Sequence, residues 1–135
     1  MILIDLNVLL DVIQARQPHY HASASVLEVA LHAETSAMIP AHAVTTIHYL
    51  VTRYNNQQSA DEAIRWLIRH FEIAPLGREQ LQRAQSLAWP DYEDAVVAAT
   101  AEMANCNYII TRNVKDFTLS PVPAVTPDEF LASRE

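Results

Sequence analysis

The chain has 135 residues, of which 50% are hydrophobic and 19% are charged. This length suits one domain spanning residues 1–135, and the composition excludes a disordered chain. Nine Lys and Arg residues against 16 Asp and Glu residues give a formal charge of −7, so the surface as a whole repels nucleic-acid backbones. Any nucleic-acid function would need metal ions, a local basic patch or a basic partner.

Short apolar segments alternate with helical patterns from start to finish. The expected strands are ILI (2–4), SAMIP (36–40), EIAPL (72–76), NYIIT (107–111) and an edge strand in PVPAV (121–125). The expected helices cover 18–34, 41–55, 59–71, 77–88, 93–104 and a short segment after Pro127. In the third of these, Ser59 and Glu62 are expected to form a capping box. The alternation predicts an α/β fold, with a mainly parallel sheet and helices on both faces.

Three features of the sequence limit the possible cell compartment and the possible cofactors. The single cysteine, Cys106, cannot form an internal disulfide, which fits a reducing cytosol. The apolar N-terminus is interrupted by acids and lacks a basic start, so we expect no signal peptide and no membrane span. The single glycine, Gly77, excludes a Gly-rich phosphate loop and a dinucleotide fingerprint. We therefore expect a cytoplasmic protein.

Acidic side chains follow the expected strands and begin the last long helix. Asp5 ends the first strand, Asn113 and Asp116 follow the fourth, and Asp94 lies in the first turn of the preceding helix. Ligands of open α/β sheets bind beyond the carboxyl ends of the strands, so these groups are expected at one rim. Clustered carboxylates repel unless a cation is present, and oxygen ligands favour Mg²⁺ or Mn²⁺. Such a site suits phosphodiester hydrolysis.

Simpler interpretations exist for several of these acids. Asp91 fits a helix N-cap better than a metal ligand, and this leaves Asp94 for the metal. Asp11 and Glu93 are expected to be solvated, and Asp116 by itself could be an ordinary loop acid.

Histidines and tryptophans are also more simply structural. The six histidines lack a zinc-binding spacing and are expected on the surface or in the core. Trp66 lies on the apolar face of its helix and is expected in the core. Trp89 precedes Pro90, and we expect it to be a lid or interface aromatic.

Three segments resemble the signature segments of the PIN domain family: ILIDLNVLLDV (2–12), DYEDAVVAATA (91–101) and YIITRNVKDF (108–117). They occur in the family's order, and the resemblance covers nearly the whole chain. It implies a sheet of about five parallel strands, an acidic Mg²⁺ or Mn²⁺ site and ribonuclease activity on single-stranded RNA. Bacterial members of this size include VapC-type toxins, which implies an antitoxin partner and a homodimer. RQPHY (16–20) and AVTTIHYLV (43–51) also resemble a subgroup of stand-alone bacterial PIN proteins.

The resemblance assigns roles to individual residues. Asp5, Asp94 and Asp116 match family acids and are implied as catalytic metal ligands, and Asn113, also implied as catalytic, stands where the family often has an acid. The substrate-binding residues implied are Thr111, Asn113, Thr46 and Asn7.

The sequence departs from the family in the helix that contains HAVTTIHYL. Many active members have a glutamate there, at the position of Thr46; Thr45 or His48 would take its place after a shift of one turn, and none is a carboxylate. The chain is therefore either a metal-dependent ribonuclease or, as the alternative, a catalytically weak or inactive PIN domain that binds RNA or protein. A phosphatase or receiver-like domain is disfavoured, because no phospho-acceptor lies beside a second acid at the first strand.

Four basic residues are candidates for RNA contacts or for solvated surface charges: Arg16, Arg53, Arg69 and Lys115.

Overall fold

The computed structural model describes residues 1–32 and 35–134 and contains a five-stranded parallel sheet. The strand order is β3-β2-β1-β4-β5, and every neighbouring pair is parallel. The strands are β1 (Ile2–Ile4), β2 (Ala37–Pro40), β3 (Glu72–Ala74), β4 (Tyr108–Ile110) and β5 (Ala124–Val125). Each lies within an expected segment, which confirms the predicted α/β fold.

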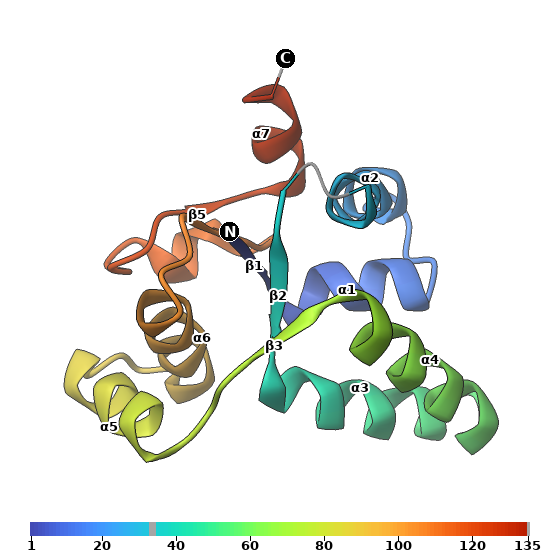
Figure 1. Ribbon diagram of the computed structural model, residues 1–135, viewed down its shortest axis with the longest axis horizontal. Coiled ribbons are helices and arrows are strands. Elements are labelled where there is room, and N and C mark those ends of the chain that lie inside the picture. Colours follow the sequence, from blue (N-terminus) through green and yellow to red (C-terminus); the bar gives the residue numbers. More distant parts are fainter. Residues whose placement is uncertain (33–34, 135) are drawn as a thin grey trace.

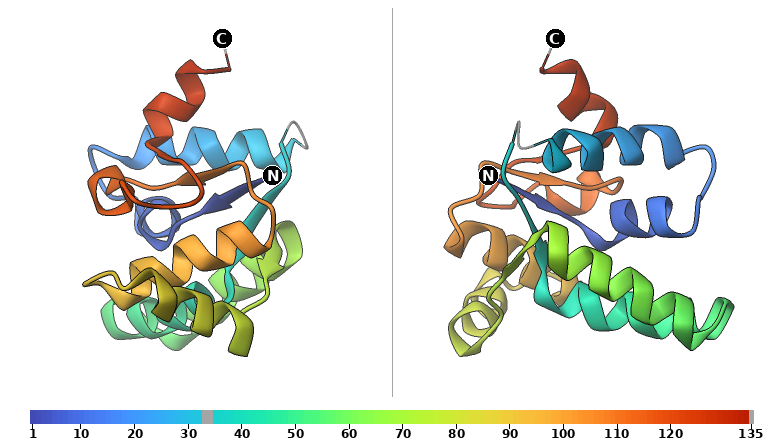
Figure 2. Two further views of the ribbon diagram at one scale, coloured as in Figure 1. Left: turned by 90° about the vertical axis from the view of Figure 1, so that its left-hand side faces the viewer. Right: turned by 45° about the vertical axis from the view of Figure 1, so that its right-hand side comes forward.

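Helices cover both faces of this sheet. They are α1 (Leu6–Ile13), α2 (Tyr20–Leu31), α3 (Ala41–Tyr54), α4 (Gln57–His70), α5 (Arg78–Leu87), α6 (Tyr92–Met103) and α7 (Pro127–Ala132), with a 3₁₀ helix η1 (Val114–Phe117). Figure 1 shows α5 and α6 on one side of the strands and α1 to α4 on the other. In the left view of Figure 2 the strands lie between α2 above and α6 below. Within the described ranges, no helix is long and apolar enough to span a bilayer.

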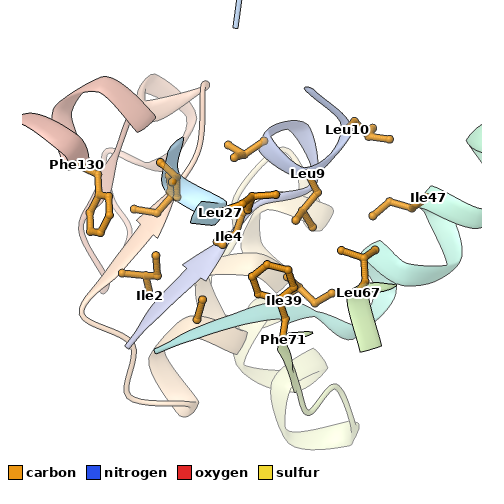
Figure 3. Close-up of a cluster of buried hydrophobic side chains, with 14 of the residues drawn as sticks. Ile2, Ile4, Leu9, Leu10, Leu27, Ile39, Ile47, Leu67, Phe71 and Phe130 are labelled. Atoms are coloured by element: carbon orange, nitrogen blue, oxygen red, sulfur yellow. The ribbon is translucent and has the colours of Figure 1, made fainter. Parts of the chain in front are cut away.

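Successive residues of the central strand face opposite layers of the core. Ile2 and Ile4 point into a cluster with residues of α1 to α4 and Phe130 of α7 (Figure 3). Leu3 points the other way, into a cluster with Val97 of α6 and Phe117 of η1. All residues of β1 are buried, as expected for a parallel strand covered on both faces. The strand ends are therefore held firmly at the rim where Asp5 lies.

Helix α1 was not among the expected elements. Its residues Val8, Leu9, Leu10 and Asp11 are buried in succession, and such a run hides the 3.6-residue period of an amphipathic helix. Asp5 begins the helix by accepting a 2.8 Å hydrogen bond from the Leu6 backbone N–H. The expected helix 18–34 is α2, which ends earlier, and residues 33–34 lie outside the described part of the chain.

The predicted capping box at Ser59 and Glu62 is wrong. Helix α4 begins two residues earlier than expected, and Asn56 is its N-cap. The Asn56 side chain accepts a 2.7 Å hydrogen bond from the Ser59 backbone N–H, so Ser59 is the third helical residue. Asn and Ser are about equally good N-caps, so the residue types alone do not decide between Asn56 and Ser59.

This correction gives a matched pair of stability predictions. We expect Asn56→Ala to lower the free energy of unfolding by about 1 kcal/mol, because it leaves the Ser59 N–H without its acceptor. Ser59→Ala removes no cap and should change stability by less than about 0.5 kcal/mol. Urea denaturation of the two variants tests this, and a larger loss in Ser59→Ala would contradict the assignment.

Candidate active site

Asp5 is held in one orientation at the carboxyl end of β1. Its Oδ1 accepts the Leu6 N–H at 2.8 Å, and its Oδ2 accepts the Thr111 hydroxyl at 2.9 Å. Only 8% of the residue is exposed. Burial raises the pKa of Asp5, and the two hydrogen bonds oppose that rise because they favour the ionised form. The carboxyl group is thus fixed by contacts that come from two different strand ends.

Thr111 joins the ends of β1 and β4. Its hydroxyl also accepts hydrogen bonds from Asn7 Nδ2 at 3.2 Å and from the Asn113 backbone N–H at 3.1 Å. The Oδ1 of Asn7 accepts the Arg112 backbone N–H at 3.2 Å. Thr111 is fully buried and Asn113 is exposed. The structure therefore engages Thr111 and Asn7 in holding Asp5 in place, and their contact with a substrate stays a prediction.

The charges of two acids from remote segments, Asp5 and Asp116, act on Asp94. Asp94 is half-buried in the first turn of α6, and its pKa is raised from 3.8 to about 6. The largest cause is burial, followed by the charges of Asp91, Asp5, Asp116 and Glu93. Asp94 and Asp116 also line one cavity of about 250 Å³. The start of α6 and the ends of β1 and β4 thus meet at one rim.

Asp91 has the role that its position predicted. It is the N-cap of α6, and its Oδ1 accepts the Asp94 backbone N–H at 3.1 Å. Glu93 is exposed, as expected, but its charge raises the pKa of both Asp5 and Asp94. The acidic group at the rim is therefore larger than the three predicted ligands.

Helix α3 brings His42 near Asp5, a contribution that sequence reasoning missed. The charge of His42 lowers the pKa of Asp5, and its Nδ1 is buried without a hydrogen-bond partner among the described residues. Thr46 lies one turn later, and its hydroxyl donates to the His42 carbonyl at 3.2 Å. His42 follows the carboxyl end of β2 by two residues. The rule that placed Asp5 at the rim could have found it.

Asp11 is not solvated, contrary to expectation. It is fully buried, and its Oδ2 accepts hydrogen bonds from Arg112 Nε at 2.8 Å and from Ser23 Oγ at 3.0 Å. This ion pair joins α1 to the segment that follows β4, next to the hydrogen bonds that hold Asp5. The role of Arg112 was not predicted, because its partner Asp11 lies 101 residues away in the sequence.

The four basic candidates differ in their surroundings. Arg16 donates two hydrogen bonds to Gln14, and Arg53 lies over the ring of Tyr54. Arg69 and Lys115 are exposed, and Lys115 is adjacent to Asp116 in η1. Contact of any of them with RNA stays a prediction.

The donor groups at the rim fit a hydrated divalent cation. Among the residues that the structure describes, no three His, Cys, Asp or Glu side chains lie close enough together to hold a metal ion by themselves. Burial and the neighbouring negative charges, which together raise the pKa of Asp94, are nevertheless what a bound cation would offset. Mg²⁺ usually keeps several waters and binds through only one or two carboxylates. Oxygen donors favour Mg²⁺ or Mn²⁺ over softer metals.

Several solved structures of toxin–antitoxin proteins have a similar fold. A toxin–antitoxin complex from Klebsiella pneumoniae contains a chain 25% identical, with a TM-score of 0.73 over 94% of this chain and 98% of that one. VapBC-1 from nontypeable Haemophilus influenzae has 16% identity and a TM-score of 0.73 over 95% and 99% of the two chains. VapC20 of Mycobacterium tuberculosis, a sarcin–ricin loop cleaving toxin, has 12% identity and a TM-score of 0.65 over 81% and 87%.

No match was found among curated proteins. The sequence profile of the PIN domain matches residues 1–115. This range contains Asp5, Asp94, Asn113 and all strands except β5, and Asp116 lies one residue beyond it. The chain belongs to the PIN domain family.

Proposed function

We propose that this protein is a metal-dependent endoribonuclease that hydrolyses single-stranded RNA, as a VapC-type toxin. The observation that carries this proposal is that Asp94 lines one cavity with Asp116 and lies close enough to Asp5 and Asp116 for their charges to raise its pKa. Membership of the PIN domain family and the likeness to the toxin–antitoxin complex from Klebsiella pneumoniae support it. The chain as a whole, residues 1–135, would act as one domain.

In this proposal Asp5, Asp94 and Asp116 hold Mg²⁺ or Mn²⁺. When bound, the cation would activate a water molecule and stabilise negative charge developing on the phosphate. Thr111 keeps the Asp5 carboxyl in place through its 2.9 Å hydrogen bond. Above a pH of about 6 the Asp94 carboxyl is ionised and available to a cation.

The remaining predicted residues would act on the substrate through neutral groups. Asn113 is exposed beside the rim and would orient the phosphate or the attacking water through its side-chain amide. Asn7 in α1 and Thr46 in α3 would contact the substrate, whereas Thr111, which is fully buried, would act by holding Asp5. The acidic rim repels RNA, so binding depends on the cation and on Lys115 or a basic partner.

Cleavage of a labelled single-stranded RNA with Mn²⁺, and none with EDTA, is the expected result. Asp5→Asn should lower the rate by at least about 100-fold, since it removes one of the charges that hold the cation. Glu79→Gln, which changes the same charge in α5, is the control and should keep the rate. Calorimetry should show Mn²⁺ binding that Asp5→Asn weakens. Cleavage that persists in Asp5→Asn would assign the activity to another site or protein.

A second candidate function is a PIN domain that binds RNA or protein without catalysis. It is favoured by the absence of a carboxylate at Thr46 and by the absence of a three-ligand cluster in the described residues. Retained RNA binding without Mn²⁺ binding at millimolar concentration would support it over the nuclease.

The partners proposed are an antitoxin protein and a second copy of this chain, in the cytoplasm. Structures similar to this chain are toxin–antitoxin complexes, which supports the antitoxin. Co-purification with the product of the adjacent open reading frame would test it, and light scattering would measure the oligomeric state.

A further inference from the structure

A cavity beside the acidic rim has one apolar wall. Its volume is about 250 Å³, and it is lined by Trp89, Pro90, Asp91, Asp94, Asp116, Thr118 and Leu119. Pockets for drug-sized ligands have volumes of about 300–1,000 Å³, so this one suits a single small ring system. Leu119 is 80% exposed, and it belongs to none of the hydrophobic clusters of the described residues.

The ring of Trp89 packs against the core at this cavity. Trp89 packs edge-on against Phe117, with ring centroids 5.8 Å apart and an interplanar angle of 81°. It packs against two core clusters, one that includes Val97 of α6 and Ile109 of β4, and one between α5 and α6. The preceding residue, Ala88, has φ 57° and ψ 38°, a left-handed conformation that is strained for alanine. A strained turn thus directs a fixed aromatic side chain into the wall of the cavity.

The charges of the cavity select against an anionic occupant. None of its lining residues is Lys, Arg or His, and three are aspartates. Without a cation at Asp94 and Asp116, a phosphate group is therefore disfavoured. A flat neutral group with N–H donors matches both the aromatic wall and the carboxylate of Asp91, which is not a proposed metal ligand. Nucleobases stack on aromatic side chains in this way when single-stranded nucleic acid is bound.

Asp91 is the carboxylate available to such a donor. It is not among the proposed metal ligands, and it uses one oxygen lone pair to cap α6 through the Asp94 N–H at 3.1 Å. A carboxylate has about four acceptor sites, so Asp91 has both oxygens available to a further ligand. Among the four RNA bases, only guanine presents two adjacent donors, N1–H and the 2-amino group, that match the two oxygens of one carboxylate.

We propose that this cavity binds a guanine base of the RNA, stacked on Trp89 and hydrogen-bonded to Asp91. The inference rests on the proposed ribonuclease function for its biological meaning. It makes Trp89 and Asp91 the residues that determine base specificity next to the acidic rim. Leu119 would close the cavity over the base.

Nucleoside binding in EDTA tests this inference without any requirement for cleavage. The chain has two tryptophans, and Trp66 packs against Phe71 away from the cavity-lining residues, so Trp66→Phe leaves Trp89 as the only indole reporter. We expect guanosine to quench its fluorescence with an affinity at least about tenfold higher than that of uridine, since two charge-assisted hydrogen bonds are gained. Adenosine and cytidine, with one amino group each, should lie between them.

Asp91→Asn in the same background should remove the preference for guanosine. Asn caps a helix as well as Asp but offers only one acceptor atom to the two donors of guanine. Leu81→Ala, at a partly exposed leucine of α5, is the control and should leave all four affinities unchanged. If Trp66→Phe does not fold, calorimetry on the wild-type protein gives the same four-way comparison.

Equal affinities for all four nucleosides, no quenching by any of them, or an unchanged preference in Asp91→Asn would each overturn the inference. Mn²⁺-dependent cleavage of RNA by a protein that does not bind guanosine would leave the proposed nuclease standing. Guanosine binding by a protein that cuts no RNA would instead contradict the nuclease and keep the base site.

Discussion

Replacing Arg112 with alanine will lower the free energy of unfolding by about 3–5 kcal/mol. The Asp11 carboxylate is fully buried, and without Arg112 Nε at 2.8 Å it keeps only the Ser23 hydroxyl as a hydrogen-bond donor. Its Oδ1 already has no partner among the described residues. An unpaired buried charge is far more costly than the lost attraction. Urea denaturation measures this loss directly.

Two variants make this experiment specific to burial. Arg83→Ala breaks the ion pair with Glu102, whose side chains are 39% and 34% exposed, and should lower stability by only about 0–1 kcal/mol. Asp11→Ala should cost less than Arg112→Ala, because the Arg112 side chain is 25% exposed and its charge can reach water. Equal losses of stability in Arg112→Ala and Arg83→Ala would show that the burial of Asp11 does not increase the contribution of its ion pair with Arg112.

The second large effect concerns Asp94, whose substitution should remove activity and increase stability. The folded protein raises the pKa of Asp94 from 3.8 to about 6, so it binds more protons than the unfolded chain between these pH values. Stability therefore falls as pH rises through that window, and above it the ionised carboxylate lowers the free energy of unfolding. Asp94→Asn removes the charge, and its backbone N–H keeps the cap from Asp91.

At pH 7.5 we expect Asp94→Asn to be more stable than the wild type by about 1–2 kcal/mol, after allowance for solvent screening of a partly exposed group. Near pH 3.5 the carboxyl is largely neutral in both states, and the difference should vanish. Thermal unfolding at the two pH values measures this. Saturating Mn²⁺ should raise the melting temperature of the wild type and not that of Asp94→Asn. Lower stability of the variant at pH 7.5 would contradict the raised pKa that burial and the neighbouring charges give Asp94.

This combination of gained stability and lost activity is expected where charge is concentrated for function. Asp91, Asp5, Asp116 and Glu93 all raise the pKa of Asp94. A purely structural acid at this place would be stabilising or neutral.

The strands and the rim were predictable from sequence because they depend on local pattern. Buried parallel strands read as short apolar runs, and Asp5 and Asp94 mark the ends of elements that a parallel fold brings to one edge. Asp91 was correctly predicted as an N-cap because capping involves only residues close in the chain. The resemblance to the PIN domain family rests on segments 2–12, 91–101 and 108–117, and the family match over residues 1–115 confirms it.

Features that depend on remote partners were decided by the tertiary structure. Asp11 is buried only because Arg112, 101 residues away in sequence, and Ser23 neutralise and solvate it. Helix α1 escaped detection because it is covered by other elements along consecutive positions. His42 acts on Asp5 because β2 lies beside β1 in the sheet. The sequence alone specified where the chain changes direction and where its acids lie, whereas the pairing of buried polar atoms depended on which strands and helices became neighbours.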